Sequence, residues 1–186
     1  MKDFRFDARE IGLLIELISQ KPVEIVWDLN AFYLNTDTTT YKMECIDAPP
    51  AGAENEYDEI FFCKIEQLES RLHFKKNAPG YWYKIVTSNA EIQVLIIVEV
   101  ERLFVDGRLF QNHNQKDTSE NINMLSLGLL IQTNEGVIPA VLVPSEFGFS
   151  WLERHGYYNL NEALELITKR VGDVELRSIS SIPTHQ

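Results

Sequence analysis

The feature that most constrains this chain is a long apolar stretch, Ile92–Val105. Taken with a period of two, one face of the stretch carries only β-branched residues: Ile92, Val94, Ile96, Val98 and Val100. Because β-branched side chains pack well on a pleated surface, this pattern predicts a central β-strand. On the other face, Glu99 and Glu101 predict that one end of the strand reaches solvent. Charged residues interrupt the run well short of the roughly 20 apolar residues that a transmembrane helix needs, so it is not a membrane span.

Two hairpins are predicted around this strand. Residues 81–87 lead into it through a short link, which predicts antiparallel pairing of 81–87 with 92–105. Residues 124–132 and 137–143 flank a turn and predict a second hairpin close to the central strand. Pro139 cannot donate to a strand ladder, so its strand is predicted to lie at an edge or to carry a bulge. One face of 124–132 carries four apolar residues: Leu125, Leu127, Leu129 and Ile131.

Two helices are predicted, at residues 7–21 and 159–171, from apolar residues at helical spacing. Each begins with the pattern of a capping box, an N-cap residue followed three positions later by Glu: Asp7 with Glu10, and Asn159 with Glu162. Gly172 directly after the second helix is typical of a helix C-terminus.

The remaining strands are predicted at residues 23–34, 39–46 and 174–179, and at 59–66, where a helical pattern also fits. The fold class is therefore α+β, with one largely antiparallel, twisted sheet of about six to eight strands and the two helices packed on it. We expect a single globular domain over residues 1–186, with three irregular parts: an acidic loop at 44–59, a polar loop at 106–121 and a loose tail at 180–186.

The formal net charge of −11 limits the classes of partner. Such a charge repels phosphate backbones and anionic lipids, so neither nucleic acid nor a membrane surface is an expected partner. A basic protein is the partner that this charge favours. The first residues contain no apolar segment of a secretory signal, so a cytoplasmic location is expected. Cys45 and Cys63 lack a CxxC pattern and are interpreted as ordinary buried thiols.

No catalytic motif marks this chain as an enzyme. It lacks the phosphate-binding GxxxxGK[ST] and GxGxxG patterns, the GxSxG elbow, HExxH and zinc-site spacing. The four histidines are scattered and predict no metal site: His73, His113, His155 and His185. His73, between two apolar residues, is interpreted as a partly buried structural residue. No cofactor is predicted, and the balance favours a protein without enzymatic activity.

The acidic segment, residues 44–59, contains no Lys or Arg. It is interpreted in three ways: as a solvated loop, as a region that attracts a basic partner electrostatically, or as a poorly matched Ca²⁺ loop. Its acidic residues are Glu44, Asp47, Glu54, Glu56, Asp58 and Glu59.

The aromatic segment, residues 144–158, is the other unusual stretch. It combines five aromatic residues with Glu153, Arg154 and His155. Aromatic residues beside Arg are typical of protein interfaces and also line small-ligand pockets, while the simplest interpretation is that they cover the end of the core.

The function favoured by these features is a non-enzymatic protein-binding module, such as an adaptor or an inhibitor or immunity-type protein. The alternative is a small-molecule-binding or hydrolytic enzyme with its site near His155, Glu153 and Arg154. The oligomeric state is not predicted. The predicted binding residues are Phe147, Phe149, Trp151, Arg154, His155, Tyr157, Tyr158, Glu54, Glu56, Asp58 and Glu59.

Overall fold

The computed structural model describes residues 1–20, 24–28, 31–53, 58–75, 83–105, 108–111, 121–145, 148–152 and 157–180. These residues form twelve strands and two helices in the following order: β1 (Lys2–Phe4), α1 (Ala8–Ser19), β2 (Glu24–Asp28), β3 (Ala31–Asn35), β4 (Thr40–Ala48), β5 (Ile60–Gln67), β6 (Tyr83–Thr87), β7 (Ile92–Val105), β8 (Arg108–Gln111), β9 (Ile122–Thr133), β10 (Val137–Ser145), β11 (Gly148–Trp151), α2 (Leu160–Val171) and β12 (Glu175–Ser180).

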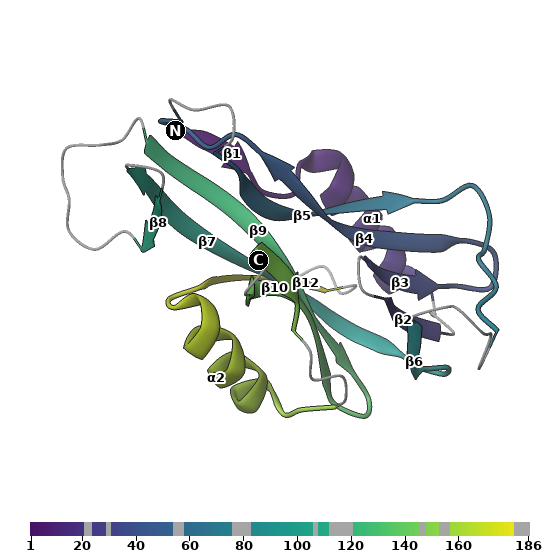
Figure 1. Cartoon of the computed structure of the whole chain (residues 1–186). Coiled ribbons are helices and arrows are strands. Elements are labelled where there is room, and N and C mark those ends of the chain that lie inside the picture. The colour runs from purple at the N-terminus through teal and green to yellow at the C-terminus, as the bar shows by residue number, and fades with distance from the viewer. Residues whose placement is uncertain are drawn as a thin grey trace, which may run out of the picture.

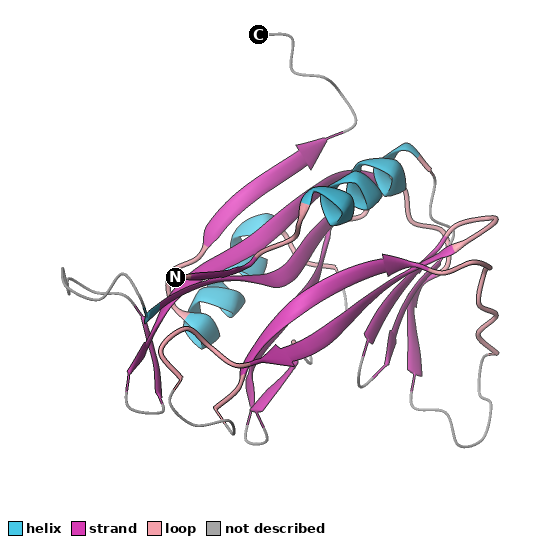
Figure 2. Ribbon diagram, turned by 90° about the horizontal axis from the view of Figure 1, so that it is seen from above, coloured by secondary structure: helices cyan, strands magenta, loops and turns pink. Residues whose placement is uncertain are grey.

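The strands form two sheets that face each other (Figures 1 and 2). A seven-stranded sheet has the order β11-β10-β9-β7-β12, with β1 beside β9 and β8 beside β7. A five-stranded sheet has the order β5-β4-β3-β2-β6. The pairs are antiparallel except for the parallel pair of β1 with β9. The α+β class and the antiparallel pairing are confirmed, but the expected single sheet is two sheets.

The predicted hairpin between 81–87 and 92–105 is wrong. Strand β6 pairs with β2 in the five-stranded sheet, and the link after β6 carries the chain into the other sheet. The predicted strand 23–34 is likewise two strands, β2 and β3, which pair with each other. The carboxylate of Asp28, the last residue of β2, accepts a hydrogen bond at 2.8 Å from the N–H of Ala31, the first residue of β3. Sequence periodicity alone did not reveal either change of direction.

The pairing of β7 with β9 and the hairpin of β9 with β10 are confirmed. The register of β7 and β9 shifts between Val98 and Glu99, which marks a β-bulge. At the bulge Gly128 has φ +139°, and a Cβ there would lie 2.1 Å from the Ala140 carbonyl oxygen. A bulge reverses the alternation of side chains, so the four apolar residues of β9 do not share one face. Leu129 and Ile131 enter the core between the sheets, and Leu125 and Leu127 enter the core that includes α2.

Pro139 predicts that its strand lies at an edge or carries a bulge, and β10 as a whole is not an edge strand, because β11 pairs with part of it. That pairing covers Leu142 to Ser145 and leaves Pro139 outside. The strands expected at 59–66 and 174–179 are present as β5 and β12. Part of the expected polar loop 106–121 is strand β8, and residues 112–120 lie outside the described residues.

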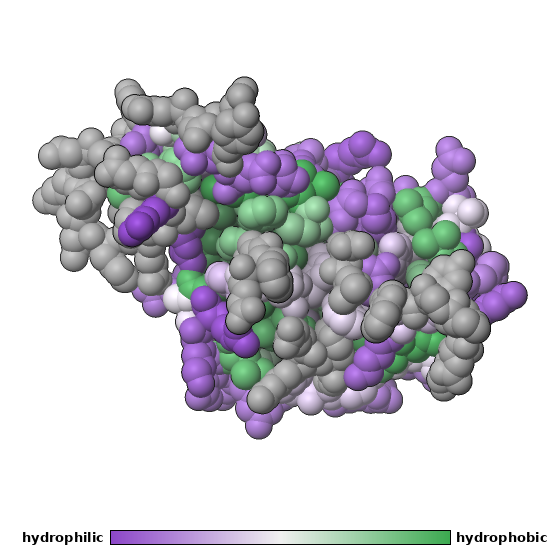
Figure 3. Space-filling view, viewed as in Figure 1, coloured by the Kyte–Doolittle hydropathy of each residue, from purple (hydrophilic) through white to green (hydrophobic). Residues whose placement is uncertain are grey.

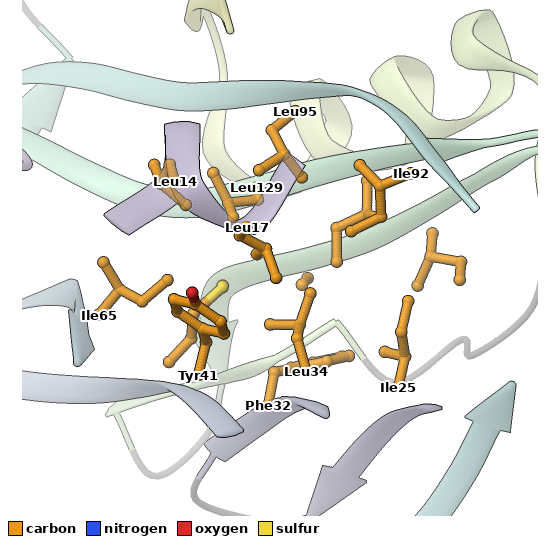
Figure 4. Packing of buried hydrophobic residues seen from close by; sticks show 14 of the residues in the cluster. Leu14, Leu17, Ile25, Phe32, Leu34, Tyr41, Ile65, Ile92, Leu95 and Leu129 are labelled. Atoms are coloured by element: carbon orange, nitrogen blue, oxygen red, sulfur yellow. The ribbon is translucent and has the colours of Figure 1, made fainter. Parts of the chain in front are cut away.

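Two apolar cores hold the layers together. The first lies between the sheets, where Leu14 and Leu17 of α1 pack between Leu95 of β7 and Tyr41 of β4 (Figure 4). Helix α1 contacts β5 of one sheet and β7 and β12 of the other, so it bridges both rather than lying flat on one. The second core joins the seven-stranded sheet to α2, whose buried residues are Ala163, Ile167 and Val171.

Both predicted capping boxes are present. In α1, the N–H of Glu10 donates to the Asp7 carboxylate at 2.9 Å, and the Glu10 carboxylate accepts from the Asp7 N–H at 2.9 Å. Gly172 ends α2 with φ +78°. In the part of the chain that the structure describes, neither helix is long and apolar enough to cross a membrane.

Candidate functional site

The base of the acidic segment is fixed to the rest of the fold. Strand β4 continues through Ala48, so the first part of the predicted loop is strand. After it, Lys2 Nζ donates to the Pro49 carbonyl at 2.8 Å, and the Ala51 N–H donates to Asn123 Oδ1 at 2.7 Å. Ala51 and Asn123 are both buried. The segment therefore leaves the sheet from an anchored base; Glu54 and Glu56 lie outside the described residues.

The acidic residues of the segment differ in their partners. Glu44 is ion-paired with Lys42, which also approaches Glu66 at 3.4 Å. Asp47, Asp58 and Glu59 have no ion pair with any described residue. Asp47 and Glu59 are exposed and Asp58 is half-buried. The uncompensated negative charge therefore lies at the far end of the β4–β5 pair.

The aromatic segment is largely built into the core. Trp151 is 2% exposed and packs edge-on against Phe32 of β3, with ring centroids 5.0 Å apart. Tyr158 is held by Val137, with backbone hydrogen bonds in both directions at 2.8 and 2.9 Å. These contacts support the interpretation that the segment covers the end of the core. Phe147, Arg154 and His155 lie outside the described residues.

Among the described residues of this segment, Tyr157 is the exposed aromatic residue, at 38%. Burial of its hydroxyl raises the pKa of Tyr157 above its ordinary value, and Thr87 and Glu135 lie beside that hydroxyl. The residue thus lies beside the end of β6 and the β9–β10 turn, rather than beside the acidic segment.

Phe149 sets the aromatic segment beside Phe61, which lies on β5 two residues after the end of the acidic segment. Its ring stacks on that of Phe61, with centroids 5.4 Å apart and an interplanar angle of 30°. Phe61 lies directly opposite Asp47 in the β4–β5 register, and Glu59 precedes it by two residues. Both aromatic residues are half-buried. We call the resulting patch the acidic–aromatic surface and define it by five residues: Asp47, Asp58, Glu59, Phe61 and Phe149.

Phe61 and Asp47 lie on the face of their strands that turns toward the core between the sheets. Successive residues of a strand point to opposite faces, so Phe61 lies on the same face as Cys63, and Asp47 on the same face as Cys45. Both cysteines pack in or against the core between the sheets. The acidic–aromatic surface is therefore the outer margin of the core, where carboxylates meet aromatic rings. The sequence predicted Phe149, Asp58 and Glu59 as binding residues and placed Asp47 in the acidic segment, but no sequence pattern indicated that these residues lie together or involve Phe61.

A second aromatic group lies on the other face of the five-stranded sheet. Phe74 packs against Tyr33 at 5.1 Å and against Tyr83 at 5.2 Å between ring centroids. Burial, and then the neighbouring Asp28, raise the pKa of Tyr33. Tyr33 is about 40 residues from Phe74 in the sequence, and Phe74 and Tyr83 belong to different segments, so no local pattern identified the group.

A further apolar area is visible where β1, β5 and β9 meet, with hydrophilic side chains around it (Figure 3). Phe4 of β1 packs there on the buried Phe62, with ring centroids 4.8 Å apart. Phe62 belongs to the core cluster that includes α2, and Phe4 packs against that cluster. These contacts attach β1 to β5 and serve the fold.

Two predictions about charged residues are wrong. Glu99 does not mark an exposed end of β7, because it is 4% exposed and accepts a hydrogen bond from the Arg177 guanidinium at 2.8 Å. Strand β12 covers this position, which periodicity on β7 could not show. His73 is exposed rather than partly buried, and the other three histidines lie outside the described residues. Among the described residues, no cluster of His, Cys, Asp or Glu could hold a metal ion.

Comparison of the chain with protein-family models, with curated proteins and with solved structures gave no match. The function must therefore be argued from the surface itself.

Proposed function

We propose that this protein is a non-enzymatic protein-binding module that binds a basic partner protein through the acidic–aromatic surface. An adaptor or an inhibitor or immunity-type protein would work in this way. The observation that carries the proposal is the stacking of Phe61 on Phe149, which sets the aromatic segment beside the strand that follows the acidic segment. Each segment alone has a simpler explanation, as a solvated loop or as a cover for the core.

The composition of the surface suits an interface. Half-buried aromatic rings contribute much of the binding energy in protein interfaces, and a rim of charge sets the rate and specificity of association. Asp47 and Glu59 supply that rim, because both are exposed and neither has an ion pair among the described residues. The formal net charge of −11 adds a long-range attraction for a basic protein.

The anchored base of the acidic segment supports the same proposal. The hydrogen bonds at Pro49 and Ala51 fix where the segment leaves β4, and the β4–β5 pairing fixes where it returns. A segment held at both ends loses less conformational entropy on binding than a free loop.

A triple variant tests the proposal: Asp47→Asn, Asp58→Asn and Glu59→Gln. The matched control removes the same number of negative charges at exposed positions elsewhere: Asp37→Asn, Glu69→Gln and Glu165→Gln. Each tagged protein is used to capture partners from native lysate at low salt, and the captured proteins are identified by mass spectrometry. We expect the wild type and the control to capture a basic protein, and the triple variant to bind it at least about tenfold more weakly. Added salt should release this protein, because salt screens the charges.

The proposal is wrong if the same proteins bind the triple variant and the wild type equally well. It is also wrong if the control variant loses the partner to the same extent, because net charge rather than this surface would then cause the binding. Circular dichroism of all three proteins checks that folding is unchanged.

The alternative of a small-molecule-binding or hydrolytic enzyme rests on Glu153, Arg154 and His155. These residues lie outside the described part of the chain, so no contact favours that alternative. It stays a prediction from the sequence.

A further inference from the structure

The two cysteines of the chain lie directly opposite each other. Cys45 on β4 is paired with Cys63 on β5 in the antiparallel register of these strands. Nothing in their sequence spacing suggests this proximity. Both residues are free thiols in the structure, Cys63 buried and Cys45 half-buried.

The type of this pair follows from hydrogen bonds elsewhere in the ladder. The Leu68 N–H donates to the Thr40 carbonyl at 2.8 Å, and these two residues flank the pair Tyr41–Gln67. A bond between flanking residues is the pattern of a non-hydrogen-bonded pair. The register runs without a shift from Tyr41–Gln67 to Cys45–Cys63, and pair types alternate along an antiparallel ladder. Cys45–Cys63, four steps along, is therefore also a non-hydrogen-bonded pair.

A second contact supports this assignment independently. Met43–Ile65 lies two steps along the same ladder and must be of the same type. The N–H of Ile65 accordingly points away from β4 and donates to the Glu10 carboxylate at 3.1 Å.

Non-hydrogen-bonded pairs bring side chains closest together. Their Cα atoms lie about 4.5 Å apart, and a disulfide needs a Cα separation of about 4.4–6.8 Å. Both thiols lie on the face of the sheet that turns toward the core between the sheets. Rotation of the two side chains brings their sulfur atoms into bonding distance without a change in strand pairing.

We propose that Cys45 and Cys63 are a redox modification site that forms a reversible intramolecular disulfide, with a low-molecular-weight disulfide such as oxidised glutathione as the oxidant. The thiolate of Cys45 attacks one glutathione sulfur, which forms a mixed disulfide and releases one glutathione thiolate. The thiolate of Cys63 then attacks the Cys45 sulfur and releases the second. Two protein thiols are oxidised, one glutathione disulfide is reduced to two thiols, and the two protons pass to the released thiolates. This inference does not depend on the proposed function.

The surroundings assign different roles to the two thiols. Cys45 reacts first, because it is half-buried, whereas Cys63 is enclosed. Burial, and then the charge of Asp47, raise the pKa of Cys45 to about 11, and burial raises the pKa of Cys63 well above its ordinary value. Both thiols are therefore mostly protonated near neutral pH, so the reduced form persists and oxidation is slow.

The disulfide would close the chain between residues 45 and 63 into a loop that contains Asp47, Asp58 and Glu59. It would lie two residues along from the pair of Asp47 with Phe61. Oxidation would thus restrain β4 and β5 next to the acidic–aromatic surface.

The test is incubation of the native protein with oxidised glutathione in mildly alkaline buffer, followed by intact-mass analysis and peptide mapping without reductant. We expect the mass to fall by two hydrogen atoms, the peptides of Cys45 and Cys63 to be linked, and a reducing agent to reverse both changes. The midpoint of thermal unfolding should rise by about 6–12 °C, since the crosslink restricts the unfolded chain.

Two single variants separate the roles of the thiols. Cys63→Ser should accumulate a stable glutathione adduct at Cys45, and Cys45→Ser should remain unmodified while it is folded. The proposal is overturned if the native wild type gains two separate glutathione adducts or a disulfide between two chains. It is equally overturned if the native wild type stays unmodified under conditions that oxidise the urea-unfolded chain.

Discussion

Replacing Glu10 with Ala is expected to lower the free energy of unfolding by about 2–4 kcal/mol. Glu10 is 4% exposed, and its carboxylate has two backbone partners. One oxygen accepts the Asp7 N–H at 2.9 Å in the capping box, and the other accepts the Ile65 N–H of β5 at 3.1 Å. Loss of the cap costs about 1 kcal/mol, and an unsatisfied buried N–H costs about 1–3 kcal/mol.

The matched control is Glu162→Ala in α2. Glu162 forms the same capping box with Asn159 at 3.1 Å, but its side chain is exposed and no bond to a strand is present among the described residues. Its loss should cost only about 0.5–1 kcal/mol. Urea unfolding followed by circular dichroism measures both losses of stability. An unchanged slope of the unfolding free energy against urea concentration shows that the folded and unfolded states remain comparable.

Equal losses of stability for Glu10→Ala and Glu162→Ala would contradict this expectation. They would mean that the bond to Ile65 contributes nothing beyond the capping box, and that α1 is not attached to β5 through this carboxylate. Glu10→Gln, which keeps one acceptor oxygen, should fall between the wild type and the Ala variant.

Three further predictions follow from the fold. Trp151→Ala should destabilise the protein by about 3–5 kcal/mol because the side chain fills the core, whereas Tyr157→Ala should cost about 1 kcal/mol; urea unfolding distinguishes them. Gly128→Ala should lower the free energy of unfolding by more than about 2 kcal/mol, because Gly128 has a positive φ and the new Cβ would collide with the Ala140 carbonyl oxygen. Gly12→Ala on α1, where a Cβ would meet no other atom, should raise it by about 0.5–1 kcal/mol in the same assay. The hydrogen bond from the backbone N–H of Glu10 lowers the pKa of the Asp7 carboxylate below its ordinary value. The stability that this bond contributes is therefore complete above the ordinary pKa and is lost as the pH falls through the folded pKa. Acid unfolding of Asp7→Asn, which caps without titrating, should show a smaller loss of stability in that range than the wild type.

The sequence predicted most of the local structure because the deciding information is local. The capping boxes of both helices and the period-two pattern of 92–105 depend on residues within a few positions of each other. The division into two sheets depends instead on which strands pair across long distances. Strand β6 precedes β7 closely in sequence yet pairs with β2, and no pattern within residues 81–87 encodes that choice.

The candidate site was predicted only in part for the same reason. Charge and aromatic content identified Asp58, Glu59 and Phe149, but the contact that joins them passes through Phe61, an ordinary residue of a strand pattern. The bulge at Gly128 was also not predicted, although a single glycine within a strand often marks a bulge or a close approach of backbone. Burial of Glu99 became apparent only once β12 was placed beside β7.

A double-mutant cycle of Phe61→Ala and Phe149→Ala tests the claim that the aromatic segment shares one surface with the strand after the acidic segment. The free energies of unfolding of the wild type, both single variants and the double variant give the coupling between the two rings. Stacked rings with centroids 5.4 Å apart should be coupled by about 0.5–1.5 kcal/mol. A double variant whose loss equals the sum of the two single losses would contradict the claim, because the segments would then not share a surface.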